Sequence, residues 1–168
     1  RIYAGIGSRN TPVEVLDFMH KLAFLLAREG WILRSGGAAG ADRSVEAGSD
    51  WGQGKKEIFY KEHAGPDAMR YGEKYHPVWN FLTEHQRMLV ARNTYQVLGA
   101  NLDDPVSMVV CWTKDGANGV DIETSKQTGG TGQAIRIAAD YDIPVFNLGN
   151  EPDYKKVESF LKTNFNME

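Results

Sequence analysis

Three glycine-rich stretches could bind an anion through the main chain. They read GIGSRN (residues 5–10), SGGAAGAD (35–42) and TGGTGQ (128–133). Glycine allows backbone N–H groups to turn toward a ligand, and a helix that begins directly after such a stretch adds a partial positive charge. The chemistry predicted for them is the binding of an anion, most often a phosphate. The side chains that could add donors are Ser8, Arg9, Ser35, Thr128 and Thr131.

The candidate ligand-binding residues belong to these stretches, with one addition after a later apolar run. They are Gly7, Ser8, Arg9, Ser35, Gly36, Gly37, Gly40, Asp42, Thr113, Gly129, Gly130, Thr131, Gly132 and Gln133. A single glycine-rich turn is more simply explained as a tight connection, because fold features alone rarely fix function. Three such turns at one edge of a sheet favour binding.

Known cofactor motifs fit these stretches poorly. GIGSRN has the first two glycines of the dinucleotide pattern G-x-G-x-x-G but lacks the third, and no acidic residue is well placed for a ribose. GAAGADRS lacks the Lys-Ser/Thr ending of a P-loop. The histidines show no zinc-like spacing. We therefore expect no cofactor and no metal.

The alternation of apolar runs and amphipathic segments predicts where these stretches lie. Strands are predicted at 2–6, 31–35, 56–60, 106–112 and 143–149. Helices are predicted at 11–30, 41–49, 81–100, 131–142 and 152–165. This order predicts an α/β fold, a Rossmann-like three-layer sandwich whose mainly parallel sheet of five or more strands carries helices on both faces. The glycine-rich stretches then share the sheet edge at which open parallel sheets bind ligands.

Helix details follow from the same pattern. Thr11, with Glu14 three residues later, predicts a capping box at the start of the first helix. The candidate core positions of helix 81–100 are Phe81, Met88, Leu89 and Tyr95.

Two segments show no regular pattern. Residues 61–80 read as a long loop of the kind that forms a lid or binding loop. Its aromatic residues include Tyr71, Tyr75 and Trp79. Residues 113–128 are polar and contain glycine, and they could fold over a ligand as a flap that brings Trp112 or Lys114 to it. Trp112 is equally well explained as a core residue at a strand end.

Composition limits the class of protein. The 168 residues suggest one domain spanning 1–168, and an apolar content of 42% supplies a core. The net charge of -3 argues against broad electrostatic binding of nucleic acid. Cys111, the only cysteine, rules out an internal disulfide and is expected to be a buried thiol. No run is long enough to cross a membrane and no signal peptide opens the chain, so a cytoplasmic location is expected.

The same residues resemble a known superfamily. GSR after the first strand, SGGAAGAD before the second helix and GGTGQAIRIA at a later helix are similar to the SLOG superfamily, which joins the DprA DNA-processing proteins to the LOG proteins. The set ARNTYQVLG, VVCWT and IPVFNL is most similar to the DprA-like proteins of bacteriophages. The resemblance spans Gly5 to Leu148. It implies a Rossmann-like fold, a nucleotide or nucleotide-derived ligand at the glycine edge, a homo-oligomer and, for a phage protein, the host cytoplasm.

The resemblance also bears on catalysis. LOG enzymes resemble nucleotide phosphoribohydrolases with the pattern P-G-G-x-G-T-x-x-E, whose glutamate acts with an arginine of an upstream helix. Here Thr128 replaces the proline, Gln133 replaces the threonine and Arg136 replaces the glutamate. A cationic side chain cannot do the work of a carboxylate at an oxocarbenium-like centre. Another acid would have to substitute, and the candidates are Asp42, Asp115, Asp121 and Glu123.

Asp42 and Arg92 are the preferred catalytic candidates. Asp42 directly follows the glycines, although stabilisation of the first turn of the second helix explains it equally well. Arg87 and Arg92 both lie on the helix before the fourth strand, and Arg92 beside Asn93 matches the phage-type motif. An arginine on a solvated helix face explains Arg92 as readily.

Three functions are therefore considered. The first is a binding protein that captures a nucleotide or a signalling nucleotide, which in a phage would remove a host immune signal. The second is a hydrolase of the N-glycosidic bond of a nucleotide. The third is a DprA-like protein that binds single-stranded DNA in recombination, which the acidic balance makes the least favoured.

Overall fold

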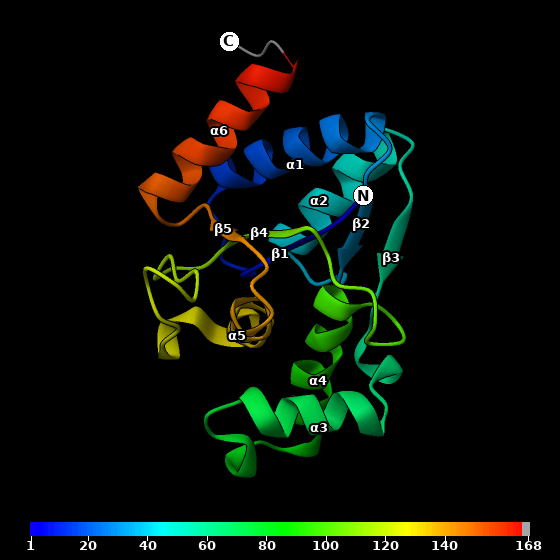
Figure 1. Cartoon of the computed structure of the whole chain (residues 1–168), viewed down its shortest axis with the longest axis vertical. Helices are drawn as coiled ribbons and strands as arrows, with labels where there is room; N and C mark the ends of the chain where they lie inside the picture. The colour runs from blue at the N-terminus through cyan, green and yellow to red at the C-terminus, as the bar shows by residue number, and fades with distance from the viewer. Residues whose placement is uncertain (166–168) are drawn as a thin grey trace.

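A five-stranded parallel sheet forms the centre of the computed structural model, which describes residues 1–165 (Figure 1). Its strands are β1 (Ile2–Gly7), β2 (Ile32–Ser35), β3 (Lys56–Ile58), β4 (Met108–Trp112) and β5 (Val145–Asn147). They lie in the order β3-β2-β1-β4-β5, and every neighbouring pair is parallel. The predicted α/β class with a parallel sheet is confirmed.

Helices cover both faces of the sheet. One layer holds α1 (Val13–Arg28), α2 (Ala41–Trp51) and α6 (Glu151–Phe165), and the other holds α4 (Glu84–Leu98) and α5 (Gly132–Asp140). Tyr3 and Val110 pack in the first layer, whereas Ala4 and Cys111 pack in the second, because successive strand residues point to opposite faces. Cys111 is fully buried, and burial raises the pKa of its thiol.

The strand order places a crevice beside β1. The chain passes from β1 to β2 and β3 on one side and then crosses to β4 and β5 on the other. The helices that follow β1 and β4 therefore lie on opposite faces, and their loops diverge where these strands end. The two strands stay paired to their ends, with Gly7 opposite Trp112 and the Ser8 N–H donating to the Trp112 carbonyl over 3.1 Å.

The start of α1 differs from the predicted capping box. The N-cap residue is Pro12, and no side chain caps the helix. The Thr11 hydroxyl instead donates to the Ser8 carbonyl over 2.7 Å. This bond closes the β1–α1 loop, so Thr11 is engaged before the helix begins. Glu14 contributes only an acidic group to the first turn.

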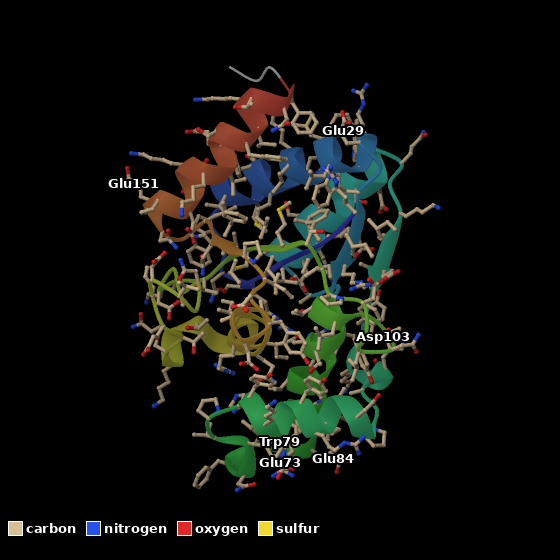
Figure 2. The ribbon with its side chains drawn as sticks, in the orientation of Figure 1. Glu29, Glu73, Trp79, Glu84, Asp103 and Glu151 are labelled. Carbon is tan, nitrogen blue, oxygen red and sulfur yellow. The ribbon has the colours of Figure 1, made fainter. Side chains whose placement is uncertain are left out.

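Residues 61–80 are not a loop, and that prediction was wrong. They form the 3-10 helix η1 (Lys61–His63), the helix α3 (Pro66–Tyr75) and the 3-10 helix η2 (Trp79–Phe81). Ala68, Tyr71, Gly72 and Tyr75 recur on one face of α3 at helical spacing. That face was overlooked because it holds small and aromatic residues in place of large aliphatic ones. Trp79 lies beside α3 (Figure 2). It packs on Gly72, where an added Cβ would lie 2.3 Å from the indole ring. The aromatic stretch is therefore a packed helical unit beside α4.

Helix α4 begins later than predicted. The Thr83 hydroxyl accepts from the Gln86 N–H over 3.2 Å, and the Gln86 side chain accepts from the Thr83 N–H over 2.9 Å. This capping box sets the first residue at Glu84. Phe81, predicted to be in the core, is 86% exposed because it precedes the helix, whereas Tyr95 is buried. Met88 and Leu89 are half-buried.

The other predicted elements are present, with ends that differ by one or two residues. Among residues 1–165, no helix has both the length and the apolar character needed to span a bilayer.

Close packing of α1 on α2 depends on Gly48. An added Cβ there would lie 2.2 Å from the His20 carbonyl oxygen. We expect Gly48→Ala to lower the free energy of unfolding by about 1–3 kcal/mol, because the two helices must move apart. Urea denaturation measures this change.

The matched control is Gly130→Ala. No atom lies within 4 Å of the Cβ that Gly130 would carry, so its unfolding free energy should change by less than about 0.5 kcal/mol. Equal stability of Gly48→Ala and the wild type would contradict the importance of this helix contact.

Candidate functional site

A cleft of about 720 Å³ opens at the crevice between β1 and β4. Its walls come from the β1–α1 loop, the start of α2, one face of α4, the end of β4 and the 3-10 segment η3 (Lys126–Thr131) before α5. Open parallel sheets bind their ligands at this position, and the size is that of a small-molecule pocket.

The structure brings part of the predicted site together in this cleft. The predicted residues that line it are Gly7, Ser8, Arg9, Asp42, Arg92, Gly129, Gly130 and Thr131. The further candidates Trp112, Lys114 and Thr128 line it as well. Segments from both halves of the chain therefore meet at one edge of the sheet.

The other predicted residues do not line the cleft. They are Ser35, Gly36, Gly37, Gly40, Thr113, Gly132 and Gln133. The Ser35 hydroxyl donates to the Gly5 carbonyl over 2.6 Å. Thr113 is bonded through its N–H and its hydroxyl to the side chain of Asn147. Gln133 donates to a carbonyl of α3 over 3.1 Å. These polar side chains join elements of the fold.

Two of these glycines are required by close packing. Gly37 and Gly40 have φ angles of 70° and 86°, which disfavour any other residue. A Cβ at Gly40 would lie 2.6 Å from the Ser8 carbonyl oxygen, and one at Gly37 would lie 2.8 Å from the Tyr60 ring. Their role in the structure is to let loops approach one another.

The carboxylate of Asp42 lies among the amides of the glycine-rich β2–α2 loop. It is only 4% exposed. Its Oδ1 accepts from the Gly7 N–H over 3.1 Å, and its Oδ2 accepts from the Ala38 N–H over 3.3 Å. Burial raises the pKa of Asp42 to about 6, although these hydrogen bonds and the charge of Arg92 oppose the shift. The anion that this loop binds is therefore the Asp42 carboxylate of the protein itself.

Arg92 and Asn93 connect the two sides of the cleft. Arg92 Nη1 donates to the Gly36 and Phe59 carbonyls over 2.9 and 3.0 Å, and its Nε donates to the Asn93 side chain over 3.0 Å. Asn93 Nδ2 in turn donates to the Gly130 carbonyl over 2.7 Å. Burial lowers the pKa of Arg92. The preferred arginine therefore lies in the cleft.

Arg87, the alternative arginine, points elsewhere. Its Nε donates to the Trp79 carbonyl over 3.1 Å, and its guanidinium lies 5.1 Å from the centroid of the Trp79 ring. This cation–π contact engages Arg87 at η2, outside the cleft wall.

The segment 113–128 is fastened by Asp115. Its carboxylate accepts from the Ser125 and Thr128 hydroxyls over 2.6 and 2.5 Å. Burial opposes ionisation of Asp115, but its hydrogen bonds outweigh this effect and hold the pKa of the carboxyl below its usual value. Asp115 therefore fixes the position of the segment that brings Lys114 and η3 to the cleft.

Of the four candidate acids, only Asp42 lines the cleft. Asp115 accepts hydrogen bonds from Ser125 and Thr128. Asp121 accepts from Asn118 Nδ2 over 3.3 Å. Glu123 is exposed. Arg136, which stands where the LOG pattern has its glutamate, also lies outside the cleft wall.

Sequence reasoning missed the contribution of one face of α4. Leu89, Asn93 and Gln96 line the cleft at the spacing of a single helix face. The spacing of these three residues is visible in the sequence, but only Arg92 and Asn93 belong to a motif of the phage-type resemblance. The other lining residues that were not predicted are Ile6, Asn10, Ala38, Val90 and Gln127.

Charge is distributed unevenly along the cleft. The exposed part of the lining, which we call the mouth, includes Arg9, Lys114, Gly129 and Gly130. The less exposed part, which we call the floor, includes the buried Asp42 and Gln96 and the half-buried Arg92. In residues 1–165, no group of three or more His, Cys, Asp or Glu side chains is placed to hold a metal ion.

Comparison of the chain with protein-family models, curated proteins and solved structures gave no match.

The pH dependence of stability tests the burial of the Asp42 carboxyl. Its pKa is about 6 in the folded protein and 3.8 in its ordinary state, so the folded state binds more protons between these values. Stability from this group is present below pH 3.8 and is lost as the pH rises through about 6. We expect the unfolding free energy of the wild type, minus that of Asp42→Asn, to fall by about 2 kcal/mol between about pH 4 and about pH 7.5.

Urea denaturation at the two pH values measures this difference. Asp17→Asn, on the exposed side of α1, is the control and should show no such change. A difference between the wild type and Asp42→Asn that stays constant with pH would contradict the raised pKa.

Proposed function

We propose that this protein binds a phosphorylated small molecule of nucleotide type in the cleft between β1 and β4. The observation that carries the proposal is the composition of the mouth, where the exposed cations Arg9 and Lys114 flank the open main chain of Gly129 and Gly130. Cationic side chains and unhindered backbone are the groups that bind phosphates in proteins.

The glycines of the mouth differ from those of the β2–α2 loop. No atom lies within 4 Å of the Cβ that Gly129 or Gly130 would carry, so packing does not explain them. Gly129 has a φ of 67°, and α5 begins three residues later without a side-chain cap. A left-handed glycine just before an uncapped helix N-terminus supports the binding of an anion.

The inner walls suit a base. Leu89, Val90 and Trp112 supply apolar surface between the mouth and the floor. A pocket of this size with apolar walls and few polar groups is typical of small organic ligands. These walls favour a nucleotide over inorganic phosphate.

A second function, hydrolysis of the N-glycosidic bond of the bound nucleotide, is favoured by Asp42. A buried carboxyl with a pKa of about 6, in a cleft and beside a guanidinium, is suited to general-base catalysis. In this reaction the Asp42 carboxylate would accept a proton from the water that attacks C1′. The bond from C1′ to the base would break with its electron pair on the base, which then takes a proton from solvent.

Titration calorimetry with AMP, GMP, CMP and UMP tests the binding function. We expect at least one of them to bind, and Arg9→Gln to weaken that binding about 10-fold because a charge-assisted contact to the phosphate is lost. Arg28→Gln, at the far end of α1, should bind as the wild type does. Binding of none of the four would remove the proposal.

Incubation with the same nucleotides distinguishes capture from hydrolysis. Release of free base, measured by chromatography, would support hydrolysis, and Asp42→Asn should then slow it by about 100-fold or more. Binding without release would support capture alone. Release that is unchanged in Asp42→Asn would exclude Asp42 as the base.

A further inference from the structure

The floor of the cleft contains a buried polar side chain without a partner. Gln96 is 2% exposed, and it lines the cleft. Within residues 1–165 its carboxamide makes no hydrogen bond, whereas Arg92 and Asn93 on the same helix are both engaged. The buried side-chain atoms of residues 1–165 that lack a hydrogen-bond partner belong to Tyr3, Ser49, Thr94 and Arg136, so the Gln96 carboxamide is not sealed from the cleft and can bond to a ligand there.

Gln96 lies at the point where the groups of the floor converge. A Cβ at Gly36 would lie 2.5 Å from Gln96 Nε2, 2.8 Å from Arg92 Nη1 and 2.9 Å from Asp42 Oδ2. The three side chains therefore gather over the backbone of one glycine. Arg92 and Asp42 are held there by bonds to the main chain. Within residues 1–165, the floor groups whose hydrogen-bonding capacity is unused are the Gln96 carboxamide and Arg92 Nη2.

The charges of the cleft orient a bound nucleotide. Near neutral pH the Asp42 carboxylate and the Arg92 guanidinium largely offset one another at the floor, so the floor carries little net charge to attract a phosphate. The phosphate is attracted instead to Arg9 and Lys114 at the mouth. The neutral end of the ligand, its base, then reaches the floor.

We propose that Gln96 recognises the base of the ligand, through an edge on which a hydrogen-bond donor and an acceptor lie side by side. A carboxamide presents one acceptor and one donor group in a plane, which matches such an edge of a nucleobase. Ribose and phosphate lack this planar arrangement. This inference rests on the proposed binding of a nucleotide. It adds that the base of the nucleotide lies at the floor of the cleft.

The experiment compares two ligands that differ only in the base. Calorimetry measures the affinity of ribose 5-phosphate and of the tightest binder among AMP, GMP, CMP and UMP, for the wild type and for Gln96→Leu. We expect Gln96→Leu to weaken nucleotide binding about 10- to 100-fold and to leave ribose 5-phosphate within about twofold of the wild type.

Thermal denaturation supplies a readout that separates recognition from a structural role. Because Gln96→Leu removes an amide without a partner, its melting temperature should equal or exceed that of the wild type. A lower melting temperature would assign Gln96 to the fold and overturn the proposal. If the leucine variant does not fold, Gln96→Met repeats the test with a side chain of similar length and no amide.

The outcomes separate this inference from the proposed function. If Gln96→Leu weakens both ligands equally, or neither, the role of Gln96 is overturned while phosphate binding stands. Equal affinity of the wild type for ribose 5-phosphate and the nucleotide has the same consequence. If the wild type binds neither ligand, the proposed function fails, and the role of Gln96 fails with it.

Discussion

The contact between the Asp42 carboxylate and the amides of two loops is the constraint on which the site depends. Gly7 ends β1 and Ala38 belongs to the β2–α2 loop, and one buried side chain accepts from both. Without it, these partly buried N–H groups would lose their acceptor at a cost in free energy. The raised pKa of Asp42 reflects the cost of holding this charge away from water.

A second carboxylate fixes the opposite wall. The Asp115 carboxylate accepts hydrogen bonds from the hydroxyls of Ser125 and Thr128 and so positions the segment that leads into α5. The bond from Asn93 on α4 to the Gly130 carbonyl then joins this wall to the helix that carries Arg92. The sheet order makes this possible, because placing β4 beside β1 brings the loops after both strands to one crevice.

The sequence predicts the sheet well and the site only in part. Apolar runs alternating with amphipathic segments are a physical requirement of a covered parallel sheet, so the class of fold could be read directly. Glycine cannot be read in the same way, since Gly40 packs against Ser8 while Gly130 faces open space. Helix α3 was missed because its inward face is made of small and aromatic residues and lacks large aliphatic ones. Gln96 was missed because a single polar residue on a helix ordinarily marks a solvated face.

The position of Asp42 also limits the kinds of ligand that suit the cleft. The β2–α2 loop has the composition of a phosphate cradle, but its amides already bind a carboxylate. A ligand charged along its whole length, such as a polyphosphate or a single-stranded nucleic acid backbone, would bring negative charge to a floor where Arg92 only offsets the charge of Asp42. A molecule with one anionic end and one neutral, hydrogen-bonding end satisfies Arg9 and Lys114 at the mouth and Gln96 within. The uneven charge of the cleft thus supports the proposed mononucleotide ligand over a polymer.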